Sequence, residues 1–182
     1  MNLLKNLSIA QKLRRMILLT SGIALLIATL VYIAIDLISY RQSLIERTSV
    51  LADIIAINTS AALTFDDEKT ANTMLQSLVT EKIILGASIY RENGELFSHY
   101  SVDEAVLTEM MGKDNELRNT IIQSGQTVFH EEDDGFDLLT PIQLDQQFIG
   151  FSHIEVSYAL LYQRMAKFIA IVFMLFLLIM VG

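Results

Sequence analysis

The sequence predicts an α+β protein in which an antiparallel sheet of about five strands lies between two apolar helices. Three observations support this fold class. Residues 16–35 form a stretch of twenty residues without a charge, MILLTSGIALLIATLVYIAI. Beyond it, apolar residues recur at spacings of three, four and seven through residue 61, as in a long helix. From Lys82 the apolar pattern changes to a period of two, which is typical of strands.

The first apolar stretch predicts a membrane helix and its orientation. At about 1.5 Å of rise per residue, a helix of this length crosses a hydrocarbon core of about 30 Å. Residues 1–15 carry four basic and no acidic residues, whereas residues 36–167 carry all 21 acidic and nine of the 13 basic residues. Because basic flanks stay on the cytoplasmic side, we expect a cytoplasmic N-terminus and an extracytoplasmic central region. Residues 168–182, FIAIVFMLFLLIMVG, predict a second membrane helix that is cut short.

Composition excludes several classes of chemistry. The chain has no cysteine, so disulfides, thiol catalysis and cysteine-bound zinc are excluded. The acidic central region argues against nucleic acid as a partner. His99, His130 and His153 form no metal-ligand spacing, and the acidic run 131–134 is interpreted as a solvated hairpin tip. With no nucleophile–base motif and no phosphate loop, we expect no cofactor, no metal and no enzyme active site in these residues.

Residues 36 to 62 contain neither Gly nor Pro and predict a helix continuous with the membrane span. Two interpretations stay open for it. The apolar positions have a period near 3.5, which favours a parallel coiled coil between two copies of the chain. Alternatively, one amphipathic helix covers the sheet of its own domain. The residues expected in the dimer seam are Leu37, Tyr40, Leu44, Leu51 and Ile54.

The sequence after this helix predicts a corner, a second helix and a first hairpin. Asp66 or Asp67 is expected to cap a helix that runs to about residue 80 and buries Ala71, Leu75 and Val79, among others. A strand over 83–90 follows. Asn93-Gly94 then predicts a tight turn, because both residues tolerate positive φ. The return strand covers 95–100.

The remaining elements follow from turn signals and alternation. Residues 101–124 are expected to be helical or mixed, with Ser101 as a cap and Gly112 as a stop. Strands are predicted over 127–131, 136–144 and 147–156, with a turn at Asp145-Gln146. Helices that precede and interrupt a single antiparallel sheet define the α+β class.

Two segments resemble a known family. The run LADIIAINTSAALTFDD at 51–67 is similar to the start of the periplasmic CHASE-type sensor domain of YfiN-like (TpbB-like) membrane diguanylate cyclases and some hybrid histidine kinases. The segment 84–100, with Asn93-Gly94 at its turn, resembles a hairpin of that family. The resemblance implies a PAS-like fold, a dimer, and a cytoplasmic relay and output domain. It also implies roles in switching or ligand binding for Asn58, Phe65, Asp66, Asp67 and Tyr90. The alternative for the first four is a helix-to-helix corner, with Phe65 packed.

The expected protein is therefore the extracytoplasmic input module of a bacterial inner-membrane receptor. It relays binding of a small ligand or periplasmic regulatory protein to an output, with a diguanylate cyclase as the leading class. Alternatives are the sensor region of a histidine kinase or chemoreceptor, or a non-signalling anchor that tethers a periplasmic partner. The expected segments are a cytoplasmic basic tail 1–15, a membrane helix 16–35, a periplasmic dimer helix 36–66, a sensor domain 67–157, an exit helix 158–167 and a membrane helix 168–182.

Overall fold

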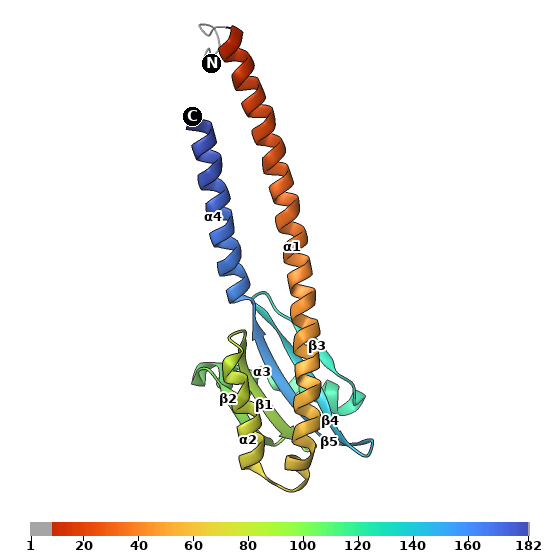
Figure 1. Cartoon of the computed structure of the whole chain (residues 1–182). Helices are drawn as coiled ribbons and strands as arrows, with labels where there is room; N and C mark the ends of the chain where they lie inside the picture. The colour runs from red at the N-terminus through yellow and green to blue at the C-terminus, as the bar shows by residue number, and fades with distance from the viewer. Residues whose placement is uncertain (1–8, 182) are drawn as a thin grey trace. The chain divides into compact units, whose positions relative to one another are not determined.

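The computed structural model describes residues 9–181, which form two compact units (Figure 1). Of the described residues, one unit contains 9–43 and 163–181, and the other contains 44–162. Helix α1 (Ile9–Thr64) and helix α4 (Ala159–Val181) contribute to both units. The predicted basic tail lies within α1 from Ile9 onward, and its first eight residues lie outside the described part.

The first unit consists of the N-terminal part of α1 and most of α4. The two helices contact each other through the rings of Tyr32 and Phe168, whose centroids lie 6.2 Å apart, and through Gly22 near the Phe176 ring. Among the described residues, one helix contains a window apolar enough to cross a membrane by length and composition. That window lies in Lys12–Thr64, has a mean hydropathy of 2.4, and is 0% buried. The second predicted span, 168–182, stays a prediction.

The second unit contains a five-stranded antiparallel sheet, so the predicted α+β class is confirmed. Its strands are β1 (Ile84–Arg91), β2 (Leu96–Ser101), β3 (Val128–Glu131), β4 (Gly135–Leu144) and β5 (Gln147–Ser157). Their order across the sheet is β2-β1-β5-β4-β3. Strand β5 is central and pairs with β1 on one side and β4 on the other.

Helices cover both faces of this sheet (Figure 1). Leu63 of α1 lies over Gly150 on one face, and Met110 of α3 (Glu104–Ser124) lies over Gly86 on the other. Under α3, Tyr90, Ile121, Leu139 and Phe151 form a buried cluster. Helix α2 (Glu68–Gln76) and the 3₁₀ turn η1 (Ser77–Thr80) complete the unit, with α2 packed mainly on β2.

One face of α1 belongs to the core of this unit, as the amphipathic interpretation requires. The buried residues recur with the period of a straight helix. They are Leu44, Thr48, Ala52, Ile55, Ala56, Thr59, Ala62 and Leu63. Leu44, predicted in the dimer seam, is only 5% exposed and is therefore a core residue. Leu51 is half-buried and Ile54 is 50% exposed, while Leu37 and Tyr40 are half-buried in the first unit.

Several local expectations are corrected. Only Gly94 has a positive φ in the first hairpin (79°), and the Asn93 side chain accepts a hydrogen bond from the Glu95 amide instead. The turn with two positive φ angles is at Asp145 and Gln146, at 49° and 67°.

The helical segment after β2 also differs from the expectation. Helix α3 runs through Gly112 without interruption, begins at the cap Asp103 rather than at Ser101, and ends at Gly125 (φ 60°). In the preceding segment, Val79 is 54% exposed rather than buried, because the chain tightens into η1 before it.

Candidate functional site

The corner between α1 and α2 is built by two adjacent aspartates with different roles. Helix α1 ends at Thr64, and Asp66 turns the chain with a φ of 59°. Asp67 then caps α2, since its carboxylate accepts from the Thr70 amide at 3.0 Å and from the Thr70 hydroxyl at 2.6 Å. These hydrogen bonds, the hydroxyl bond first, lower the pKa of Asp67, and nearby Lys69 acts in the same direction. The expected cap at 66 or 67 is thus Asp67.

Asp66 is available for another contact because its neighbour caps the helix. Its carboxylate forms an ion pair with the guanidinium of Arg91, at the end of β1. The guanidinium also lies over the Phe97 ring, 4.5 Å from the centroid, and the Arg91 side chain is 33% exposed. The cation–π contact with Phe97 and the ion pair with Asp66 together hold the planar guanidinium of Arg91 in place. Sequence reasoning missed Arg91, because its only signal is its place before the Asn93-Gly94 turn.

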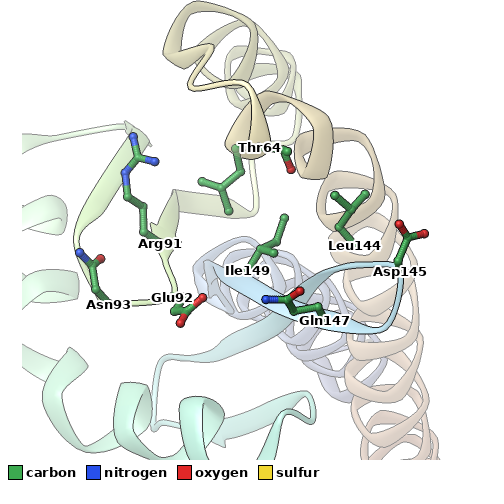
Figure 2. Close-up of a pocket in the computed structure, with 9 residues that line it drawn as sticks. Thr64, Arg91, Glu92, Asn93, Leu144, Asp145, Gln147 and Ile149 are labelled. Atoms are coloured by element: carbon green, nitrogen blue, oxygen red, sulfur yellow. The ribbon is translucent and has the colours of Figure 1, made fainter.

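Arg91 lines an open pocket of about 580 Å³ beside this corner (Figure 2). Three elements form it: the end of α1, the β1–β2 hairpin and the β4–β5 hairpin. Figure 2 shows Ile149 and Leu144 rising toward the end of α1, where Thr64 lies. The lining divides into an apolar group and a polar group. The apolar residues are Leu63, Leu144 and Ile149, and the polar residues are Thr64, Arg91, Glu92, Asn93, Asp145 and Gln147.

None of the five residues singled out by resemblance lines this pocket. Tyr90 is fully buried on the α3 side, where it stacks on Phe151 at 4.9 Å and lies under Arg118 at 4.3 Å. Asn58 is exposed on α1. Phe65 is 81% exposed, so the expectation that its ring packs at the corner is wrong. The structure therefore joins Asp66 to Arg91, leaves Asp67 as the cap of α2, and places Asn58 and Tyr90 elsewhere.

Phe65 instead extends a row of exposed apolar residues on α1. We call this row the outer stripe: Val50, Ile54, Ile57, Ala61 and Phe65. Ile57 is 71% exposed, and the amide of Phe65 still bonds to the Ala61 carbonyl at 2.9 Å in the helical pattern. The spacings of four, three, four and four place these side chains on one helix face. A smaller pocket of about 340 Å³ lies beside it, and Asp53, Ile57 and Pro141 are among its lining residues.

The exit from the sheet into α4 is held by backbone contacts from the acidic hairpin. The Tyr158 amide donates to the Asp134 carbonyl at 2.7 Å, and the Tyr162 hydroxyl donates to the Asp133 carbonyl at 3.1 Å. The Ser157 hydroxyl accepts from the Ala159 amide at the first residue of α4. The run 131–134, expected only as a solvated tip, thus also anchors the start of α4.

A buried polar pair lies within the sheet on the α3 side. His153 Nε2 and Asp137 Oδ1 are 3.0 Å apart, and their side chains are 0% and 2% exposed. His99 and His130 are exposed. Among the described residues, no group of three potential ligands is placed to hold a metal ion.

Comparison with known proteins identifies the class of domain. The CHASE8 family, described as a periplasmic sensor domain, matches residues 40–155. This match covers more than half of the chain, and the chain therefore belongs to the CHASE8 periplasmic sensor domain family. No curated protein matches it.

Three solved structures are similar to parts of this chain at low identity. MglC from Myxococcus xanthus is 16% identical, with a TM-score of 0.38, covering 48% of this chain and 79% of that one. The extracellular domain of the putative histidine kinase mmHK1S-Z2 is 12% identical, with a TM-score of 0.43 and coverages of 63% and 54%. A Roadblock/LC7 domain from Streptomyces avermitilis is 14% identical, with a TM-score of 0.35 and coverages of 48% and 78%.

Proposed function

We propose that this chain is the input module of a bacterial inner-membrane receptor. Its periplasmic sensor domain binds a small ligand or a regulatory protein, and its membrane helices relay that event to the cytoplasm. The family match and the exposed apolar window of α1 support this proposal. The basic residues of the tail favour a cytoplasmic N-terminus.

The observation that carries the proposal is that α1 has two working faces in one unbroken helix, Ile9–Thr64. One face is part of the sensor core, and the outer stripe is exposed rather than packed on the domain's own sheet. We propose that two copies of the chain pair along the outer stripe. Leu51 contributes at the edge of this interface, and Leu37 and Tyr40 contribute nearer the membrane. A signal that prefers one packing of this dimer then shifts its population, whereas equal affinity for both packings would shift nothing.

The output that we propose is a cytoplasmic diguanylate cyclase, on the strength of the resemblance at 51–67. A histidine kinase or chemoreceptor output would use the same input geometry. The 182 residues act without catalytic chemistry, cofactor or metal of their own, and nucleic acid is not among their partners. Cyclic dinucleotide production by the full-length receptor, and none by residues 1–182 alone, is the expected result. A receptor that carries another output would overturn the cyclase assignment only.

Cysteine cross-linking tests the dimer. The native chain has no cysteine, so single substitutions report without background. In membranes, Val50→Cys, Ile54→Cys and Ile57→Cys should form disulfide-linked dimers on mild oxidation. Ala52→Cys and Ile55→Cys, which face the core, are the matched controls and should not. Equal cross-linking at all five positions, or none, would overturn the proposed relay through paired α1 helices. The proposal that remained would be an anchor that tethers a periplasmic partner without signalling.

A further inference from the structure

We propose that the pocket at the end of α1 binds a free α-amino acid with an apolar side chain, and that its carboxylate competes with Asp66 for Arg91. This inference rests on the sensor function proposed above and names the ligand class for that function. A volume of about 580 Å³ lies within the range of small-molecule sites. Three features of the lining select the ligand chemistry.

The first feature is the cation. Among the described residues that line the pocket, Arg91 alone is basic. Its guanidinium is held against Phe97 and is bonded to Asp66 through one terminal nitrogen, Nη2. A guanidinium carries five N–H donors, so once Asp66 is displaced Arg91 can bind a ligand carboxylate in the bidentate geometry that arginine favours. A fixed cation loses little conformational entropy when it binds.

The second feature is the pair of carboxylates on facing hairpins. Glu92 follows Arg91 in the first hairpin, and Asp145 lies at the tip of the second. Among the described residues, neither side chain takes part in a hydrogen bond or ion pair. Acceptors of this kind suit an ammonium group, and the Asn93 and Gln147 amides add neutral donors and acceptors. A ligand with both charges therefore matches the rim better than an anion or a cation alone.

The third feature is the apolar floor. Leu63, Leu144 and Ile149 line the pocket, and Leu63 is only 6% exposed. An aliphatic side chain that covers these residues removes apolar surface from water, at about 25 cal/mol per Å². The floor therefore favours leucine, isoleucine or valine over polar amino acids.

The competition at Arg91 links the pocket to the corner. Asp66 holds a left-handed φ of 59° immediately after α1, and its ion pair with Arg91 joins the corner to β1. A ligand carboxylate that displaces Asp66 would release this contact. The ligand would then favour the corner conformation in which the Asp66–Arg91 pair is broken, which is the differential affinity that a switch requires.

The test uses the full chain in lipid nanodiscs and three probes: L-leucine, N-acetyl-L-leucine and L-leucinamide. Calorimetric titration should show L-leucine binding, and loss of either charged group should weaken it by about tenfold or more. Arg91→Gln should abolish binding, and Arg91→Lys, which keeps the charge without the fork, should weaken it. Asp66→Asn removes the competitor and should tighten binding by about threefold or more. Glu81→Gln, an exposed acid outside the pocket, is the control and should leave binding unchanged.

Three results would overturn the inference. The first is no binding of any apolar amino acid at about 10 mM, which is weaker than a specific site of this kind would be. The second is equal affinity for L-leucine and L-leucinamide. The third is an Asp66→Asn chain that retains the wild-type melting temperature and binds more weakly than wild type. The cysteine pattern on the outer stripe does not depend on these probes. Loss of leucine binding with an intact cross-linking pattern would therefore overturn the ligand class alone.

Discussion

Ile55 and Ile57 lie two residues apart on α1 and provide a paired test of its two faces. Ile55 is 5% exposed in the core, and Ile57 is 71% exposed on the outer stripe. Ile55→Ala removes roughly three methylene equivalents at about 0.8 kcal/mol each, and the cavity that is left adds to the loss. We expect a destabilisation of about 3 kcal/mol, inside the range of about 2–5 kcal/mol for such core truncations. Ile57→Ala should change the stability of the folded monomer by less than about 0.5 kcal/mol.

Urea unfolding of the full chain in detergent measures both effects. The six tyrosines give a near-ultraviolet circular dichroism signal, and the chain has no tryptophan. Each variant is measured at a low and a high protein concentration, because dimer formation makes apparent stability depend on concentration. Ile57→Ala should reduce that concentration dependence, and Ile55→Ala should lower stability at both. If Ile57→Ala destabilises the chain as much as Ile55→Ala at low concentration, the assignment of the two faces is wrong.

Three further predictions concern single contacts. Gly150→Ala places a Cβ against the Tyr90 carbonyl oxygen, and β1 must then move, so we expect a loss of about 1–3 kcal/mol in the same unfolding assay. The pKa of Asp67 is lower in the folded state than in the unfolded state. Its ionised carboxylate therefore stabilises the fold fully above about pH 4, and this stabilisation is lost as the pH falls through the lowered pKa. In thermal melting, Asp67→Asn should therefore lower the melting temperature at pH 7, and its melting temperature should differ less from that of wild type near pH 2. Asp137→Ala removes the buried carboxylate that contacts His153 Nε2 and should cost about 1–3 kcal/mol, whereas a variant that melts like wild type would show that the pair is unimportant for stability.

Local chemistry accounts for the elements that could be predicted from the sequence. Alternating residues placed the strands, because a period of two in a half-buried segment is characteristic of a strand. Asp67 as a cap follows from three residues of sequence, since its partner Thr70 lies in the next turn. The Asp66–Arg91 pair joins residues 25 positions apart, and it depends on where β1 ends relative to the corner. No periodicity carries that information, so the cation of the pocket could not be predicted.

The long helix shows why an apolar stripe alone is ambiguous. A period of 3.5 and a period of 3.6 differ by about 20° per heptad, so a stripe that extends over a few heptads drifts from one face to its neighbour. The heptad pattern places Leu44 in the seam although it lies in the core, and it omits Ile57, which is exposed. Gly112 is ambiguous in the same way. A glycine often marks the end of a helix, but within a helix it lowers stability by only about 1 kcal/mol, and α3 continues through Gly112.

The central place of β5 has a mechanical consequence. Residues 150 to 156 are hydrogen-bonded to neighbours on both sides, and only Tyr158 separates this strand from the first residue of α4. A load applied along β5 at its C-terminal residue would act on both ladders in shear, so many hydrogen bonds would resist together. A strand at the sheet edge would unzip one bond at a time. Force applied at the C-terminal end of β5 is therefore shared between two ladders and not borne by one.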